Sequence, residues 1–252
     1  MPRFSANLGF LWRELSLPEA IGAAAQAGFD AVECHWPYGH DPLAVKAALD
    51  AGRLTMLGIN TMPGREGEFG LSALPGREAE ARAAIDEAIG YAVMIGAKRI
   101  HVMAGLAAGG KARRVFLANL DHACCVAEEH DIGILVEPIN SHDVPGYFLD
   151  GFDLAAELIS RAGRRNLKLM FDFYHAGRMG HDVLRLFENL MPVTGHVQIA
   201  AVPDRGPPDH GEIDYAEVFD FLDAIGWSEP VGAEYRPVGK TEESLAWLGR
   251  RI

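Results

Sequence analysis

Oxygen-bearing side chains stand at the ends of four short apolar segments in the second half of the sequence. They are Glu137, Asp172, Gln198 and Glu234. If these segments are neighbouring strands of one parallel barrel, about 4.8 Å apart, the four side chains can converge above its carboxyl end. Three carboxylates this close repel one another unless a cation holds them or some are protonated. Ligands that are all oxygen favour a hard divalent ion, so the pattern predicts a site for Mg²⁺ or Mn²⁺.

The elements that must position these groups follow an alternating pattern. Short apolar or β-branched runs alternate with longer amphipathic runs, which favours βα units and a parallel sheet. We expect eight strands, at residues 3–8, 31–34, 54–60, 99–103, 133–137, 167–172, 193–200 and 231–234. Eight strands, each followed by a helix, close a parallel sheet into a barrel, and about 250 residues is a typical length for one such domain. We therefore predict an α/β fold, a single (β/α)₈ TIM barrel spanning residues 1–252.

Helix signals agree with this arrangement. Ser16 and Glu19 form a capping box with a proline just inside the helix, and Gly28 suits its left-handed end. Further helices are expected at residues 42–51, from Pro75 to about residue 95, up to about residue 130 and at residues 241–252, with a long loop at 61–74. The alternative, an open doubly wound sheet, would carry a glycine-rich phosphate loop after its first strand, and residues 7–12 are not such a loop.

Charge and composition argue against several classes of protein. The formal net charge of −12 opposes non-specific binding to DNA, RNA or anionic membranes. No apolar run reaches the roughly 18 residues of a membrane helix, and the N-terminal residues lack the apolar stretch of a signal peptide. We therefore expect a cytoplasmic protein without nucleic-acid or membrane partners. The three cysteines form neither a disulfide framework nor a CxxC pair.

Six segments make the sequence similar to a known family. They are Arg3-Phe4-Ser5-Ala6-Asn7-Leu8, Leu74-Pro75-Gly76-Arg77-Glu78, Val136-Glu137-Pro138-Ile139-Asn140, His196-Val197-Gln198-Ile199-Ala200, Gly211-Glu212-Ile213-Asp214-Tyr215 and Glu234-Tyr235-Arg236-Pro237. With these segments the chain resembles, over nearly its whole length, the hydroxypyruvate isomerase family within the xylose-isomerase-like barrels. The resemblance implies that Glu137 and Glu234 are the acid/base pair, and that Glu137, Asp172, Gln198 and Glu234 hold the metal.

The reaction that this resemblance implies interconverts hydroxypyruvate and tartronate semialdehyde through an enediol. A divalent ion would stabilise the oxygen charge, and the two glutamates would remove and return the proton. Such a substrate is a small anionic sugar acid, and arginine matches a carboxylate with two parallel hydrogen bonds. Arg205 is the first candidate for that contact, which the family resemblance supports, with Arg77 and Arg236 as weaker ones. His175 and Asn60 are further candidates for substrate binding, whereas His196 is expected to be a packed core histidine.

Several alternatives stay open. Residues 69–74 and 101–105 are more similar to the related 2-oxo-tetronate isomerases, so the acid has either three or four carbons. Ketose 3-epimerases share the architecture but typically carry a histidine where this chain has Gln198. A metal-dependent abasic-site endonuclease would need a histidine-rich zinc cluster and a basic groove. A binding module, which would need no acid/base pair, is another alternative. The oligomeric state is also open, because barrels of this kind can pair through their outer helices to form a homo-oligomer.

Overall fold

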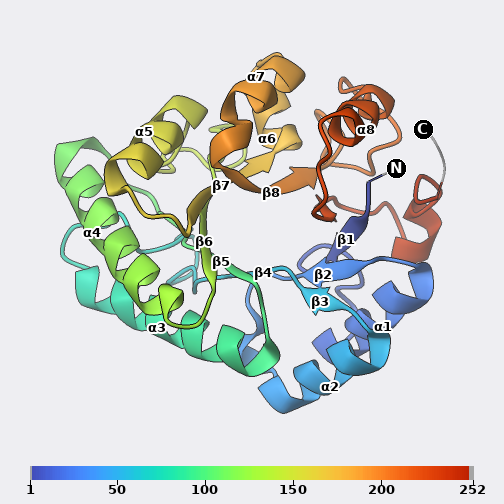
Figure 1. Cartoon of the computed structure of the whole chain (residues 1–252), viewed down its shortest axis with the longest axis horizontal. Coiled ribbons are helices and arrows are strands. Elements are labelled where there is room, and N and C mark those ends of the chain that lie inside the picture. The colour runs from blue at the N-terminus through green and yellow to red at the C-terminus, as the bar shows by residue number, and fades with distance from the viewer. Residues whose placement is uncertain (1, 250–252) are drawn as a thin grey trace.

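Parallel strands form a barrel with helices on its outside (Figure 1). The computed structural model describes residues 2–249. The strands are β1 Phe4–Asn7, β2 Ala31–Glu33, β3 Thr55–Met56, β4 Gly58–Asn60, β5 Arg99–His101, β6 Gly133–Val136, β7 Leu167–Asp172, β8 Thr194–Ile199 and β9 Val231–Ala233. Their order is β3-β2-β1-β9-β8-β7-β6-β5-β4, and every pair is parallel. The predicted α/β class and barrel are confirmed.

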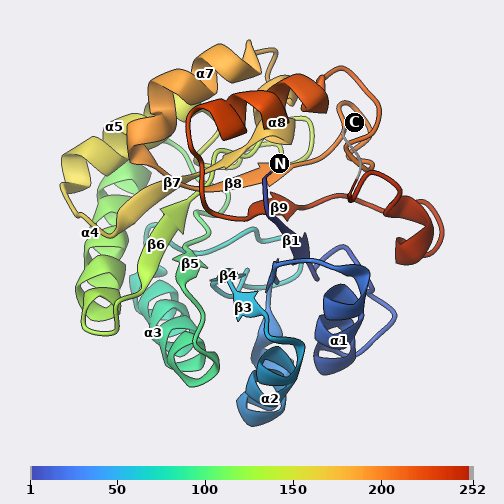
Figure 2. The ribbon, with the colours of Figure 1, turned by 45° about the vertical axis from the view of Figure 1, so that its right-hand side comes forward.

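The third predicted strand is divided at Leu57, and this division is where the barrel closes. Its first half, β3, pairs with β2, and its second half, β4, pairs with β5. The Leu57 amide donates to the Val32 carbonyl at 2.7 Å, and the Cys34 amide donates to the Gly58 carbonyl at 3.1 Å. The two halves together therefore fill one of eight strand positions. At the other end of the sequence β9 pairs with β1, as Figure 2 shows.

Helices follow the strands and cover them. They are α1 Leu17–Ala27, α2 Pro42–Gly52, α3 Glu78–Ile95, α4 Gly109–Glu128, α5 Phe152–Ala162, α6 Phe173–Arg178, α7 Val183–Leu190 and α8 Tyr215–Ala224, with 3₁₀ turns η1 Pro37–Gly39, η2 Met191–Val193 and η3 Thr241–Ser244. At the start of α1, the Glu19 carboxylate accepts from the Ser16 amide and hydroxyl. Gly28 ends the helix with a φ of +91°, as the sequence predicted. Among residues 2–249, no helix has the length and apolar content needed to cross a membrane.

The prediction of a helix at residues 241–252 is wrong. Over the described part of residues 241–252 the chain forms only the 3₁₀ turn η3 and then further turns up to Gly249, whose φ is +85°. The reason is tertiary, because Trp247 is buried and its indole nitrogen donates to the Tyr235 hydroxyl at 3.3 Å. That hydroxyl also bonds Ser244, so local packing replaces helix hydrogen bonds. Residues 250–252 lie outside the described residues.

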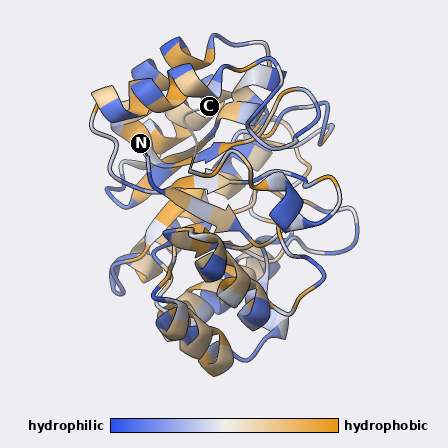
Figure 3. Cartoon of the chain, turned by 90° about the vertical axis from the view of Figure 1, so that its right-hand side faces the viewer, coloured by the Kyte–Doolittle hydropathy of each residue, from blue (hydrophilic) through white to orange (hydrophobic). Residues whose placement is uncertain are grey.

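Apolar side chains fill the space between the helices and the barrel wall. Figure 3 colours most strand segments hydrophobic and many of the connecting loops hydrophilic. The interior of the barrel is different, because Glu33, His101 and His196 are buried inside it. The His196 Nε2 lies 2.6 Å from a Glu33 oxygen, which confirms that His196 is a buried, hydrogen-bonded histidine. This polar interior lies directly below the strand ends that carry the candidate site.

Candidate active site

The four predicted oxygen donors lie at the carboxyl ends of β6 to β9 and are all buried. Glu137 directly follows β6, Asp172 ends β7, Gln198 lies one residue before the end of β8, and Glu234 directly follows β9. Asp172 is paired in register with Gln198, so these two side chains come from adjacent strands at the same level. None of the four is more than 6% exposed. Burial of three carboxyl groups at one end of the barrel is costly unless charges or hydrogen bonds compensate them.

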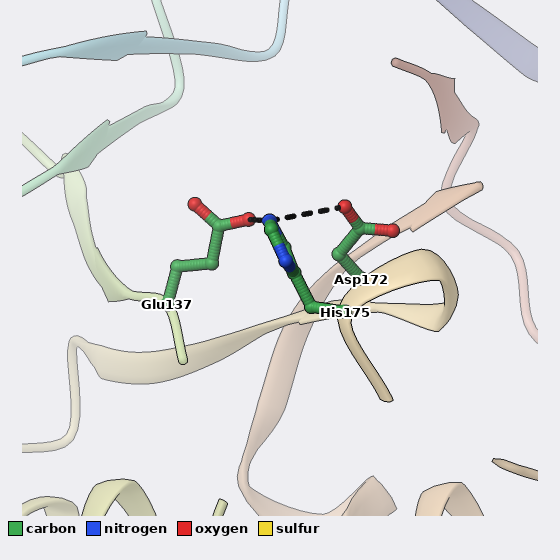
Figure 4. A group of neighbouring side chains, drawn as sticks. All are labelled: Glu137, Asp172 and His175. Carbon is green, nitrogen blue, oxygen red and sulfur yellow. Dashed lines mark ion pairs between the residues drawn. The ribbon is translucent and has the colours of Figure 1, made fainter. Parts of the chain in front are cut away.

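Three side chains form the tightest part of the site. Ligand-type atoms of Glu137, Asp172 and His175 all lie within 4.8 Å of one another. The imidazole of His175 lies between the two carboxylates, with its Nε2 3.6 Å from Glu137 Oε1 and 3.7 Å from Asp172 Oδ2 (Figure 4). Asp172 also caps α6, since its Oδ1 accepts from the Tyr174 amide at 2.8 Å. That cap fixes one carboxylate oxygen and leaves the other for the cluster.

Three of the four predicted donors carry an oxygen that suits a cation. Glu137 Oε1, Asp172 Oδ2 and Gln198 Oε1 are buried and have no hydrogen-bond partner. The other end of the Gln198 amide, Nε2, lies 3.5 Å from Glu33 Oε2, which orients the amide. Native proteins rarely leave buried oxygens without a partner, and such exceptions mark sites for water or ions. The residues therefore fit a hard divalent ion.

Glu234 is the exception, because protein donors already satisfy it. Its Oε1 accepts from Asn7 at 2.8 Å and lies 2.9 Å from His35 Nε2. Its Oε2 forms an ion pair with Arg205 at 2.7 Å. The same Arg205 nitrogen lies 3.7 Å from Asp172 Oδ2, so Arg205 joins the two ends of the carboxylate cluster. In this arrangement a guanidinium, rather than a metal ion, balances Glu234.

Arg205 is held firmly over the mouth of the barrel. Its guanidinium lies 4.9 Å from the ring centres of both Phe10 and Tyr174, a distance typical of cation–π contacts. Asp143, from the loop after β6, lies 3.6 Å away on another side. The Arg205 backbone has a φ of +57°, and its carbonyl accepts from the Arg236 amide at 2.7 Å. The loop between β8 and α8 therefore presents this side chain inward.

The carboxyl groups of the cluster have pKa values that diverge. Burial, followed by the charges of Glu234 and Asp172, raises the pKa of Glu137 well above its ordinary value. Burial raises the pKa of Asp172 to about 7, although Arg205 opposes the shift. Burial also acts to raise the pKa of Glu234, but Arg205 and then His35 outweigh it and lower this pKa to about 2. Without a metal, the pKa of Glu137 therefore lies above that of Glu234, and such a separation of pKa values is typical of acid/base pairs.

The remaining candidates for substrate binding lie at different distances from this cluster. His175 belongs to it, and burial and then Arg205 lower the pKa of its ring well below the ordinary value. Asn60 ends β4 beside His101, and both residues line a small internal cavity of about 10 Å³. Arg77 lies just before α3 and pairs with Glu68 at 3.0 Å and Glu80 at 2.5 Å. Within residues 2–249, the ion pairs of Arg77 are therefore with residues outside the cluster.

Several residues of the site were not identified from the sequence. Asn7 and His35 contact Glu234, and Asn140 contacts His175 at 2.7 Å. His101 lies 3.6 Å from Glu137, and burial lowers its pKa to about 3. Asn7 and His101 are the last residues of β1 and β5, so a search of every strand end would have found both. Asn140 lies in a loop, within one of the six segments that resemble the known family, but no role was assigned to it, and His35 lies in a loop outside those segments.

Cation binding at the cluster is expected to depend on pH. Metal ions bind carboxylates and displace their protons, so Mn²⁺ binding should release protons and tighten as pH rises from about 6 to 8. The groups responsible are Glu137, whose pKa is raised, and Asp172, whose pKa is about 7. Isothermal titration calorimetry in buffers of different ionisation enthalpy measures both effects. An affinity that does not vary with pH, with no proton release, would contradict the assignment.

The same protonation has an effect on the metal-free protein. The folded state holds protons on Glu137 and Asp172 that the unfolded chain releases above about pH 4. Because the native state binds more protons in this range, the free energy of unfolding contributed by Asp172 falls as pH rises from about 4 to 7. Added metal should reverse this trend, since it replaces the protons.

Comparison with known proteins agrees with this fold. The profile of the Xylose isomerase-like TIM barrel family matches residues 21–251. A 2-oxo-tetronate isomerase of Cupriavidus necator is 42% identical over 254 residues, which cover 98% of both chains. A hydroxypyruvate isomerase of Escherichia coli is 36% identical, again over 98% of both chains. A crystal structure from Brucella melitensis, described as an AP endonuclease of family 2, has a TM-score of 0.94 at 39% identity and covers 98% of both chains.

These matches define the class. The chain belongs to the xylose isomerase-like TIM barrel family. Its nearly full-length relatives include both hydroxypyruvate isomerase and 2-oxo-tetronate isomerase. The predicted resemblance and the prediction of an isomerase are therefore confirmed.

Proposed function

We propose that this protein isomerises small sugar acids, with hydroxypyruvate and tartronate semialdehyde as the preferred pair. The observation that carries the proposal is the pair of buried glutamates, Glu137 and Glu234, at the end of the barrel where three buried oxygens, one of them Glu137 Oε1, have no hydrogen-bond partner. The names of the relatives add support for sugar-acid substrates. The alternative within the same class is a four-carbon 2-oxo-tetronate, which differs in length but offers the same reacting groups.

The chemistry requires a proton to move between neighbouring carbons. A base removes a proton from the hydroxymethyl carbon of hydroxypyruvate, and an acid delivers one to the former carbonyl carbon, while the hydroxyl proton moves to the other oxygen. Glu234, held by Asn7 and His35, is suited to remove the proton, and Glu137 to deliver one. The roles exchange in the reverse direction. A divalent ion bound at Glu137, Asp172, Gln198 and Glu234 would supply Lewis-acid stabilisation of the oxygen charge.

Arg205 is proposed to bind the substrate carboxylate, and its replacement tests this. Charge-assisted hydrogen bonds contribute about 1.5–3 kcal/mol, so Arg205→Ala should raise KM for the acid by about 10- to 100-fold. Arg205→Lys keeps the charge but loses the planar fork, and should recover only part of the loss. Arg185, an exposed residue of α7, offers a matched control. Steady-state kinetics with an unchanged KM in Arg205→Ala would place the carboxylate contact elsewhere.

The experiment that tests the function is a substrate panel. Hydroxypyruvate, 2-oxo-tetronates and ketoses are incubated with Mg²⁺, Mn²⁺ or EDTA, and the products are followed by proton NMR. We expect isomerisation of an acid that is lost in EDTA. A ketose changed only in configuration, with its carbonyl position kept, would instead indicate an epimerase.

The description of the Brucella melitensis structure gives one further candidate a specific basis. An abasic-site endonuclease would be expected to use zinc ions bound by several histidines and a basic groove. Here the one candidate metal cluster within residues 2–249 contains a single histidine, and the sequence carries a net charge of −12. Cleavage of an abasic-site duplex that is lost in Glu137→Ala would nevertheless overturn the isomerase proposal.

A further inference from the structure

The loop after β6 contains an asparagine, Asn140, whose side-chain amide forms hydrogen bonds at both its oxygen and its nitrogen. Asn140 is 0% exposed and lies three residues beyond Glu137. Its Oδ1 accepts from the backbone amides of His142 at 3.1 Å and Asp143 at 3.0 Å. Its Nδ2 lies 2.7 Å from Nδ1 of His175, and its backbone nitrogen lies 3.3 Å from the same ring atom.

These contacts fix which end of the Asn140 amide is which. A backbone N–H can only donate, so the atom that faces His142 and Asp143 must be the oxygen. With the amide turned over, its NH₂ would face those two N–H groups and lose both hydrogen bonds. The group that faces His175 is therefore the NH₂, which can only donate.

The orientation of Asn140 in turn fixes the proton of His175. Nδ1 receives hydrogen bonds from the Asn140 side chain and from its backbone amide, so Nδ1 must offer its lone pair and carries no proton. A neutral imidazole then has its proton on Nε2. That nitrogen is the one that lies 3.6 Å from Glu137 and 3.7 Å from Asp172 (Figure 4).

We propose that Asn140 is a positioning residue that holds His175 as the neutral tautomer with its proton on Nε2. His175 then offers an N–H donor, and no lone pair, to the space between Glu137 and Asp172. It is therefore not a ligand of a cation bound there, although its distances alone would allow it to be one. The metal would be left with oxygen donors only, which keeps the site suited to Mg²⁺ or Mn²⁺ rather than Zn²⁺.

The role of this N–H group in turnover rests on the proposed function, whereas the tautomer does not. In an isomerase, a neutral N–H donor at this place can stabilise oxygen charge on the substrate without bringing a positive charge of its own. The position of the proton can be measured whether or not the protein isomerises a sugar acid. An experiment can therefore contradict the tautomer without contradicting the proposed isomerase function, and the reverse.

The test is the ¹⁵N resonance of each ring nitrogen of His175 in long-range ¹H–¹⁵N correlation spectra. Protonated and unprotonated ring nitrogens give well-separated signals, and His175→Gln assigns them among the ten histidines. We expect an unprotonated Nδ1 and a protonated Nε2 in the wild-type protein. A proton on Nδ1 in the wild-type protein would overturn the proposal.

Asn140→Asp is the informative variant, because the carboxylate is nearly isosteric but accepts where the amide donated. We expect a proton on Nδ1 of His175 in this variant, and an unprotonated Nδ1 would overturn the role of Asn140. If Asn140→Asp does not fold, Asn140→Ala should show a mixture of tautomers in place of one. Asn119 is another fully buried asparagine, in α4, where its NH₂ donates to Ser72, so Asn119→Asp is the matched control. It should leave the His175 signals unchanged, and a change there would mean that the tautomer responds to general loosening.

Metal selectivity gives a second measurement that does not depend on activity. In Asn140→Asp the neutral ring exposes its Nε2 lone pair to the cluster, and a nitrogen ligand favours Zn²⁺ over Mn²⁺. The ratio of Zn²⁺ to Mn²⁺ affinity should rise about tenfold or more, the size of effect that residues behind metal ligands have. The added charge strengthens the binding of both ions, so only the ratio is diagnostic. A ratio equal to that of the wild-type protein would overturn the claim that Asn140 keeps His175 out of the metal's ligand set.

Discussion

Replacing Glu137 by glutamine is expected to lower turnover by about 10²–10⁴-fold while leaving the fold and its stability intact. The substitution removes a proton carrier, because glutamine cannot exchange a proton with the substrate. Glutamine keeps the shape of the side chain, and burial and the neighbouring carboxylates, which raise the pKa of Glu137, already disfavour its charged form. The substitution therefore costs the fold little.

The measurement combines kcat for the preferred acid with thermal unfolding in EDTA. Glu188→Gln, at an exposed position of α7, makes the same chemical change away from the cluster and should match the wild-type protein in both. Turnover retained within a few-fold in Glu137→Gln would remove Glu137 from the acid/base pair.

Replacing Glu234 by glutamine is expected to lower turnover by a similar factor, but also to destabilise the protein. Arg205 is largely buried, and Glu234 is its nearest anionic partner at 2.7 Å. Removing one partner of a buried ion pair costs about 3–5 kcal/mol, because the other charge is left uncompensated. We expect the lower end of this range, since Asp172 and Asp143 remain within 3.7 Å of the guanidinium.

The pKa of Glu234, which is lowered to about 2, also determines how its contribution to the free energy of unfolding changes with pH. A carboxyl with a lowered pKa stabilises the folded state above its unfolded value, near 4.3, and loses that contribution as pH falls toward 2. The stability difference between the wild-type protein and Glu234→Gln should therefore be full at pH 7 and shrink in acid. Denaturant unfolding at a series of pH values measures it. Equal stabilities of Glu137→Gln and Glu234→Gln at pH 7 would contradict the electrostatic account of the cluster.

The sequence predicted the barrel and the placement of the strand-end oxygens because both depend on simple periodicity. Parallel strands share a direction, so a polar residue at the end of an apolar run reaches the same mouth as its neighbours. The same reasoning predicted a helix at residues 241–252, where the described residues form turns instead. The packing of Trp247 against Tyr235 decides the local structure there, and it cannot be recognised from the residues of this segment alone.

The charge arrangement of the site was also beyond the sequence. The sequence analysis predicted that Arg205 binds the substrate carboxylate, but it did not predict that Arg205 pairs with Glu234 and lies beside Asp172. The tautomer of His175, in α6, depends on Asn140, which lies 35 residues earlier in the loop after β6. Such contacts follow from the closed barrel, which brings the ends of separate βα units together, and not from residue spacing along the chain.

If the strand-end oxygens share one cation, Arg205 has to move. A metal ion that binds Glu234 Oε2 would replace the Arg205 guanidinium there. Arg205 would then be free to turn toward a substrate carboxylate. The most direct measurement is anomalous diffraction from crystals of the protein grown with Mn²⁺. We expect one strong peak about 2.1 Å from oxygens of Glu137, Asp172, Gln198 and Glu234, with Arg205 moved off Glu234. A peak coordinated by His175, or the Arg205–Glu234 pair intact with no peak between the strand ends, would contradict the account.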